Sequence, residues 1–217
     1  MNKVRFNMKF ISTIVISFLI LNGEIMAIEE PKFKVLTAKE NYEIREYDPI
    51  LVAETKINGS FDESGNLAFR ILADYIFGNN VSKEKIEMTA PVAQKQNSEK
   101  IEMTAPVSQV SSDEGYLVQF TMPSKYTMDT IPKPVDPRVL LKIIPSKKVA
   151  VLRYSGFWSE EKYKEKLAML RKNLLEDKIK TMGEPVFARY NPPFQLWFLR
   201  RNEIWIEVEY SPSKEIK

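Results

Sequence analysis

The sequence predicts an α+β fold in which two helices pack on one antiparallel sheet or barrel. Two observations carry this prediction. The order strand, strand, helix, strands occurs twice along the chain, and each helical segment has a single apolar stripe. The chain has 217 residues, of which 44% are hydrophobic and 28% charged, as in one or two globular domains. We therefore expect a pseudo-duplicated domain with one helix in each half.

The first half begins with two predicted strands and one helix. Residues 42–47 alternate apolar and polar side chains, and a second apolar segment, residues 50–55, follows after a proline turn. Residues 64–77 then have helical spacing and are followed by a Gly-Asn-Asn stop. Extended segments come next and end in residues 117–122. The helix should place four apolar side chains on one face: Ala68, Ile71, Leu72 and Tyr75.

The second half repeats this order. Residues 139–144 and 148–154 are predicted strands, and Ser159 is a suitable N-cap for the second helix. Residues 186–190 and 204–208 are the closing strands. The stripe of the second helix has spacings of four, three and four: Tyr163, Leu167, Leu170 and Leu174. The proline-rich residues 131–137 are expected to join the halves as an extended strap.

The first 27 residues have the pattern of a secretory signal peptide. Three basic residues precede an apolar run, residues 10–21, and the small residue Ala27 offers a cleavage point. The run is short for a membrane span, which needs about 20 apolar residues, although an uncleaved anchor is the alternative. We expect residues 1–27 to be the signal and residues 28–217 to form a single domain, exported to the periplasm or secreted.

The charge of the chain gives no case for nucleic-acid binding. Its formal net charge is +3, and removal of residues 1–27 would leave 29 Lys and Arg against 28 Asp and Glu. Nucleic-acid binding depends on clustered cations that displace counterions from phosphates. We therefore expect a small-molecule ligand and no nucleic-acid partner.

The sequence contains no Cys and no His. Disulfides, thiolate nucleophiles, Cys/His zinc sites, His-based triads and imidazole ligation of haem are therefore excluded. An enzyme that uses carboxylate, lysine, tyrosine or a Ser/Lys pair remains open. So does a binding protein that recognises its ligand by shape and apolar contact.

A nine-residue segment, EKIEMTAPV, occurs twice, at residues 84–92 and 99–107. In each copy four apolar residues alternate with polar residues or proline, so each copy can form a strand with one apolar face. Two interpretations remain open. The copies form a duplicated hairpin around residues 96–98, or they line a ligand site, for which methionine is suited because it adapts to irregular apolar shapes.

Several motifs, taken together and in order, resemble the SOUL/haem-binding protein family. They are the two MTAPV segments, FTMP at residues 120–123, YSG at 154–156, NPP at 191–193 and RRNEI at 200–204. The resemblance spans residues 33–208. It implies a distorted antiparallel β-barrel flanked by two helices with internal pseudo-symmetry. It also implies binding of haem or a related tetrapyrrole, as a cofactor or cargo, without an established catalytic activity.

The chain departs from the pattern of that family at two places. Glu87 and Glu102 stand where a small apolar residue is usual. Phe194 and Gln195 follow the Pro-Pro pair, where some members carry a basic residue, so one partner for a propionate is missing.

For the flat apolar face of a tetrapyrrole, the first helix offers a wall. An exposed side is expected from the spacing of Phe69, Leu72, Ala73 and Ile76, and the resemblance adds the position of Tyr75. The alternative is that the same stripe is the inner face of the helix, packed on the sheet.

Three arginines are candidates for the propionates, because guanidinium binds carboxylates in bidentate geometry: Arg70, Arg200 and Arg201. The alternative for Arg201 is an ion pair with Glu203 that braces the fold. The iron is left with Met, Tyr or Lys as possible ligands, and Tyr75, Met88 and Met103 are the nearest in this interpretation. Without imidazole, we expect apolar docking with weak or absent axial ligation, for transport or buffering of the tetrapyrrole.

Two rival functions remain. A hydrolase would use Glu87 and Glu102, or Ser and Lys within residues 155–166, but no spacing identifies a nucleophile and a base. A binding barrel for other flat amphiphiles, or for a protein partner, is equally compatible with the fold. We expect no catalytic residue.

Overall fold

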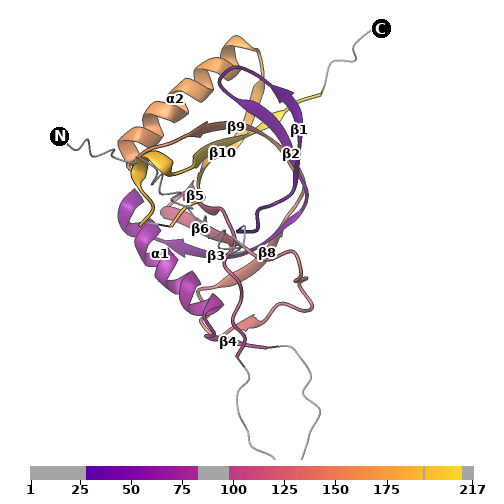
Figure 1. Ribbon diagram of the computed structural model, residues 1–217, viewed down its shortest axis with the longest axis vertical. Coiled ribbons are helices and arrows are strands. Elements are labelled where there is room, and N and C mark those ends of the chain that lie inside the picture. The colour runs from indigo at the N-terminus through magenta and orange to yellow at the C-terminus, as the bar shows by residue number, and fades with distance from the viewer. Residues whose placement is uncertain (1–27, 83–97, 193, 212–217) are drawn as a thin grey trace, which may run out of the picture.

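A computed structural model describes residues 28–82, 98–192 and 194–211 of the chain. Nine strands form one curled antiparallel sheet, a half-barrel, with two helices on its outer side (Figure 1). The order of the strands across the sheet is β1-β2-β9-β11-β10-β5-β6-β3-β8. This arrangement confirms the predicted α+β class. The bounds of these strands are β1 Phe33–Ala38, β2 Glu43–Tyr47, β3 Ile50–Ile57, β5 Val107–Ser112, β6 Gly115–Thr121, β8 Leu140–Ile144, β9 Lys147–Tyr154, β10 Lys180–Arg189 and β11 Asn202–Glu209.

The first helix, α1 (Phe61–Ile76), packs on β3 and β6. It begins at Ser60, whose side chain accepts a hydrogen bond from the Glu63 amide, and acidic residues in its first turn suit the positive end of the helix dipole. The predicted apolar stripe is its buried face. It contributes Ala68, Ile71, Leu72, Tyr75 and Ile76 to a core shared with the sheet.

The second helix, α2 (Glu160–Glu176), covers β9, β10 and β11. Ser159 caps it by accepting from the Lys162 amide, as predicted. Tyr163, Leu170 and Leu174 of the predicted stripe are buried, and Leu167 packs at their edge. β3 and β9, which precede the two helices, have the same order of buried and exposed positions, so the two halves of the sequence repeat at the level of packing.

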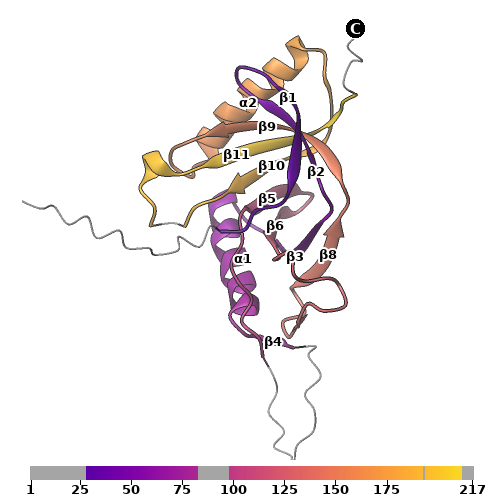
Figure 2. The ribbon, with the colours of Figure 1, turned by 45° about the vertical axis from the view of Figure 1, so that its right-hand side comes forward.

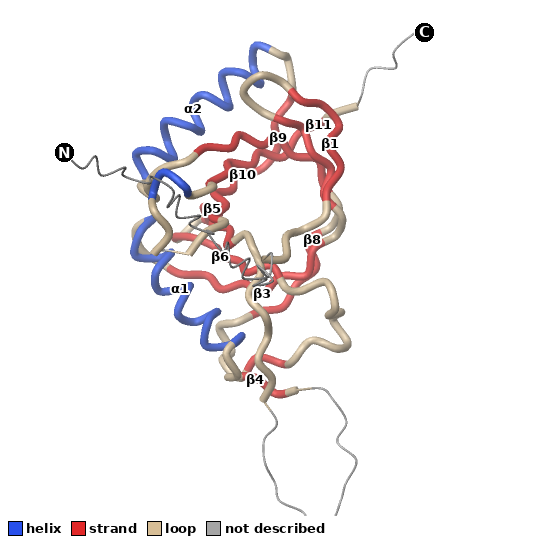
Figure 3. Tube along the Cα trace, viewed as in Figure 1, coloured by secondary structure: helices blue, strands red, loops and turns tan. Residues whose placement is uncertain are grey.

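The concave side of the sheet has its own side chains, because neighbouring residues of a strand point to opposite faces. In β11 the apolar residues Ile204, Ile206 and Val208 face α2. Glu203 and Trp205 therefore face the concave side, where Trp205 packs with Tyr47, Val149, Val151, Ala188 and Tyr190. The backbone in Figure 3 shows how the strands curl around this side.

The second EKIEMTAPV copy differs from the prediction, because only its last residue, Val107, is in a strand. The segment is instead anchored by single hydrogen bonds, from the Ile101 amide to the Ile76 carbonyl and from the Ala105 amide to the Glu29 carbonyl. The expected hairpin therefore does not include residues 101–106. The first copy, with Glu87 and Met88, lies outside the described residues, as does the expected signal, residues 1–27.

The strap between the halves contains one short strand. β7 (Lys133–Pro134) pairs with β4 (Asn80–Val81) beyond the end of α1. In the parts of the chain that are described, neither helix is long and apolar enough to cross a bilayer.

Candidate functional site

The expected apolar wall on α1 is mostly core, and the expectation of an exposed side is wrong. Leu72 and Ile76 are 0% and 1% exposed, and Ala73 is also buried. The reason is that the same spacing that makes an apolar face also makes the helix pack that face on the sheet. Of the four residues of the expected wall, only Phe69 lies at the edge of this core, and the centre of its ring is 5.3 Å from the centre of the Phe120 ring.

Tyr75 belongs to the same core. It is 1% exposed, and its hydroxyl donates a hydrogen bond to the Pro132 carbonyl at 2.8 Å. Burial raises the pKa of Tyr75, because a phenolate would lose its hydration. In this conformation Tyr75 is neither at the surface nor ready to ionise, so it is poorly suited to bind iron.

The other candidates on this side of the molecule are exposed. Arg70 lies on the outer side of α1, and Met103 is also exposed, on the segment that runs past the helix end. Near them, the side-chain nitrogen of Lys100 lies 5.8 Å from the centre of the exposed Phe77 ring. Met88 lies outside the described residues.

Arg201 braces the fold, as the alternative for it predicted. Its guanidinium pairs with Glu203 at 3.0 Å and with Glu30 at 2.9 Å, and it stacks on the ring of Tyr190 at 3.7 Å. Glu203 is fully buried and also pairs with Arg45 at 3.2 Å. Because these partners already hold it, Arg201 is not available to a ligand carboxylate.

An exposed apolar patch lies where β10 connects to β11. The connection contains the short 3-10 helix η1 (Trp197–Leu199), which extends beyond the sheet (yellow helical turn in Figure 2). Each member of the patch is a large apolar side chain that is 49–85% exposed. We call these six residues the η1 patch: Phe157, Phe194, Leu196, Trp197, Phe198 and Leu199.

Aromatic stacking and backbone hydrogen bonds hold the patch together. The Gly156 amide donates to the Trp197 carbonyl at 3.1 Å, which ties the β9–α2 loop to η1. The rings of Phe157 and Trp197 are stacked with their centres 5.3 Å apart, and Phe198 meets Trp197 edge to face. Exposed apolar patches of this kind mark ligand grooves or docking sites more often than chance, since water contact there is unfavourable.

Two arginines contact Trp158, the residue that follows Phe157 of the patch. Arg200 stacks on the ring of Trp158 at 4.4 Å, and its Nε donates to the Gln195 carbonyl. Arg189 lies between the rings of Trp158, Phe61 and Phe187, at 4.9–5.5 Å from their centres. Trp158 therefore makes cation–π contacts with both arginines.

Arg189 has no carboxylate within 4 Å among the described residues. Its Nη2 donates to Gln109 at 3.2 Å, but its Nε is buried without a hydrogen-bond partner. Burial lowers the pKa of Arg189 to about 10, so the guanidinium is still charged at neutral pH. A partly buried cation that has the charge of Asp62 nearby, but no close ion pair among the described residues, suits a ligand that carries an anionic group.

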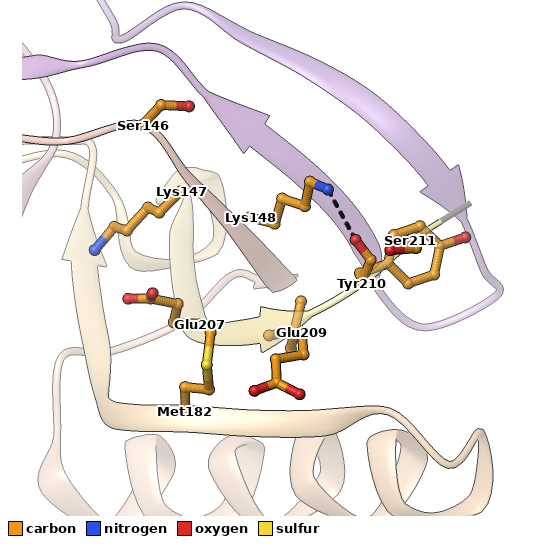
Figure 4. Close-up of a pocket in the computed structure, with 9 residues that line it drawn as sticks. Ser146, Lys147, Lys148, Met182, Glu207, Glu209, Tyr210 and Ser211 are labelled. Carbon is orange, nitrogen blue, oxygen red and sulfur yellow. Dashed lines mark hydrogen bonds between the residues drawn. The ribbon is translucent and has the colours of Figure 1, made fainter. Parts of the chain in front are cut away.

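Two clefts also open on the described surface. The larger, of about 710 Å³, lies at the edge of the sheet and has a polar lining of lysines, glutamates and serines (Figure 4). The smaller, of about 360 Å³, lies between residues 29–32 and the loop after β6. The larger cleft lacks the wide apolar wall that the face of a tetrapyrrole needs.

The carboxylates considered for a hydrolase do not form a site in the described chain. Glu102 lies on the surface and pairs with Lys125 at 3.6 Å, and Glu87 is not described. No group of three or more acidic side chains that would hold a metal ion occurs within residues 28–82, 98–192 and 194–211.

Sequence reasoning missed most of the η1 patch. Phe194 was considered only for the basic residue missing beside it, and the other members were not considered at all. The signal was present in FQLWFL at residues 194–199, an apolar run between a Pro-Pro pair and an Arg-Arg pair. Such a run resembles a buried strand, and only the fold shows that this one lies in an exposed connection.

Known proteins resemble this chain in sequence over most of its length. The model of the family described as SOUL heme-binding protein matches residues 28–207. "Heme-binding protein 2" of Mus musculus is 31% identical over 202 residues, which cover 90% of this chain and 93% of the relative. "Heme-binding protein 2" of Homo sapiens is 32% identical over 178 residues, which cover 81% of this chain and 82% of the relative.

Among solved structures, the C-terminal domain of EcmrR shares the fold. It superimposes with a TM-score of 0.55 at 12% identity and covers 78% of this chain and 98% of that domain. An identity this low concerns the fold alone. The match to the family model over residues 28–207, together with the two relatives, shows that this chain belongs to the SOUL haem-binding protein family.

Proposed function

We propose that the protein binds haem or a related tetrapyrrole at the η1 patch, with Arg189 and Arg200 as partners for its carboxylates. The observation that carries this proposal is the juxtaposition of six exposed apolar side chains with two arginines stacked on aromatic rings. Membership of the SOUL family and the names of the two relatives support the class of ligand.

The residues at the η1 patch fit the chemistry of such a ligand. Trp197, Phe198 and Phe157 offer aromatic surface to the flat face of a porphyrin, and apolar contact is the main source of affinity for such a face. Arg189 supplies a cation whose Nε has no internal partner. The α1 stripe, by contrast, is already covered by the sheet.

The sequence contains no histidine, so no imidazole is available as an axial ligand for haem iron. We propose that recognition rests on the porphyrin face and its carboxylates, and that axial ligation is weak or absent. Tyr75 is buried, whereas Met103 is exposed. The bound metal would supply redox chemistry or colour, whereas this chain's residues bind and orient the ring.

Titration of the protein with hemin and, separately, with metal-free protoporphyrin tests this proposal. We expect equal affinities, because the iron contributes little. The variant Trp197→Ala should weaken both about tenfold, the equivalent of about 1.4 kcal/mol for the lost aromatic contact. Leu175→Ala is the matched control, because Leu175 is 78% exposed at the far end of α2.

Two outcomes would contradict the proposal. Equal weakening by Trp197→Ala and Leu175→Ala would show that the η1 patch is not the site. A sharp six-coordinate low-spin spectrum that disappears in a single Met or Tyr variant would show that axial ligation, not apolar docking, holds the haem. Competition with unrelated planar dyes distinguishes a tetrapyrrole site from one for flat amphiphiles in general.

We also propose that the protein acts outside the cytoplasm, in transport or buffering of the tetrapyrrole. The pattern of residues 1–27 supports export. Fractionation of the producing cells and mass analysis of the recovered chain test this. A chain that begins near residue 28 in the exported fraction is expected, and a full-length chain confined to the cytoplasm would contradict the proposal.

A further inference from the structure

The cleft in Figure 4 lies at the edge of the sheet, where β9 begins and β11 ends. Its volume is about 710 Å³, and β10 contributes Met182 to it. It shares no residue with the η1 patch, so any ligand that it holds is independent of the tetrapyrrole. Its lining consists of Ser146, Lys147, Lys148, Met182, Glu207, Val208, Glu209, Tyr210 and Ser211.

The two lysines of the cleft differ in their surroundings. Lys148 donates a hydrogen bond to the Tyr210 carbonyl at 2.8 Å (Figure 4). Lys147 is partly buried, and its side chain makes neither a hydrogen bond nor an ion pair with any described residue. In Figure 4, Lys147, Glu207 and Met182 lie on one side of the cleft, whereas Lys148 and Tyr210 lie on the other.

The position of Lys147 follows from the register of the sheet. Lys147 lies opposite Tyr47 of β2, so both side chains face the concave side. Burial lowers the pKa of Lys147, and the negative charge of Glu207 only partly offsets this. More of its side chain is therefore present as neutral amine at a given pH than is usual for lysine, and neutral amine is the nucleophilic form.

We propose that Lys147 is a covalent capture site for small polar aldehydes, which enter the cleft and form an imine with its amine. The polar lining selects against large apolar molecules, and about 710 Å³ is ample for an aldehyde of the size of pyridoxal. Lys148 is the matched internal comparison, because it lines the same cleft but is already hydrogen-bonded.

The chemistry requires no further reactant. The lone pair of the Lys147 nitrogen attacks the carbonyl carbon, a C–N bond forms, and the carbonyl oxygen takes up a proton to give a carbinolamine. The nitrogen loses one proton to solvent, the hydroxyl takes up a second proton and leaves as water when the C–O bond breaks, and the nitrogen then loses its remaining proton. The product is an imine, reached by condensation without any oxidation or reduction.

Reductive trapping tests the proposal on the full chain. The protein is incubated with substoichiometric pyridoxal and sodium cyanoborohydride, which reduces the imine to a stable secondary amine, and labelled lysines are located by peptide mass mapping. We expect Lys147 to carry severalfold more label than Lys148 or any other lysine. Lys147→Arg should abolish this preference, whereas Lys148→Arg should leave it unchanged.

Label that is distributed according to solvent exposure, or that is greater at Lys148 than at Lys147, would overturn the proposal. The mapping of the unaltered protein is decisive by itself, so the test stands even if the Lys147→Arg variant fails to fold. Excess hemin should not reduce labelling of Lys147, because the cleft and the η1 patch are separate. Failure of tetrapyrrole binding therefore leaves this proposal unaffected.

Discussion

Glu203 is the central acceptor of a hydrogen-bond network on the concave side of the sheet. Its carboxylate accepts hydrogen bonds from Arg45, Arg201, Tyr190 and Trp205 within a fully buried environment. Burial by itself would raise the pKa of Glu203, but Arg45 and its other donors outweigh burial and lower it. The carboxylate is therefore ionised in the native protein and neutralised by two arginines.

Replacement of this carboxylate should be costly. Glu203→Gln removes the anion that Arg45 and Arg201 share, so that Arg45 keeps only Glu43 and Arg201 only Glu30. Breaking a buried pair typically costs about 3–5 kcal/mol. Urea denaturation measures the loss. Glu209→Gln is the control, because Glu209 lies on the same strand but its pair with Lys180 is exposed; it should change stability by less than about 1 kcal/mol. Equal losses of stability in the two variants would show that the buried network stabilises the protein no more than the exposed Glu209–Lys180 pair does.

The same group predicts a pH dependence. Since the native pKa of Glu203 lies below its unfolded value, the stability that its charge provides is present above pH of about 4.3, the usual pKa of glutamate. It is lost as the pH falls below that value and through the native pKa. The difference in free energy of unfolding between wild type and Glu203→Gln should therefore shrink between neutral and acidic pH. A difference that grows on acidification would contradict this sign.

At the scale of elements, the exposed apolar surface lies on the connection that contains η1 and not on α1, where it was expected. The helix, expected to offer a ligand wall, supplies core side chains to β3 and β6. The connection, with no regular period in its sequence, carries the exposed apolar side chains. Regular periodicity predicts which residues share a face, but whether that face is covered depends on the neighbouring elements.

Substitutions in α1 distinguish these roles. Leu72→Ala removes a fully buried side chain and should cost about 2–5 kcal/mol of stability, with hemin affinity unchanged in the remaining folded protein. Leu67→Ala, on the same helix but 46% exposed, should leave stability nearly unchanged. Denaturation and hemin titration of both variants measure this. A specific loss of hemin affinity in Leu72→Ala would show that the ligand binds against α1.

For the whole molecule, one sheet joins the two halves of the sequence. β10 of the second half pairs with β5 of the first, and β2 of the first pairs with β9 of the second. The core clusters under α2 and on the concave side are both built on β2, β9, β10 and β11, whereas the cluster under α1 is built on β3 and β6. Neither half has a complete sheet of its own, so independent folding of the halves is not expected.

This architecture predicts a single cooperative transition. All three tryptophans, Trp158, Trp197 and Trp205, lie in the second half, so their fluorescence reports on that half, whereas far-UV circular dichroism reports on the whole chain. Urea unfolding curves from the two probes should coincide. Two separated midpoints would show that the halves unfold as separate units.

The local elements were largely predictable from the sequence. Ser159 and the spacing from Tyr163 to Leu174 specified α2, and the proline turn between β2 and β3 was correctly placed, because capping and periodicity are properties of neighbouring residues. β1 was not predicted, since it lies at the sheet edge and its residues are mostly exposed. The second MTAPV copy was predicted as a strand, but it lies outside the sheet ladder until Val107.

The sequence by itself determined the class of fold, the family and the absence of imidazole and thiol chemistry, since these depend on composition and on motifs along the chain. Only the tertiary structure decided which apolar side chains are covered. It buried Leu72 and Ile76 under the sheet, paired Arg201 with Glu203 and left Trp197 and Phe198 in contact with water. The physical reason is that solvent exposure and charge pairing depend on residues far apart in sequence, which only the packing of the strands brings together.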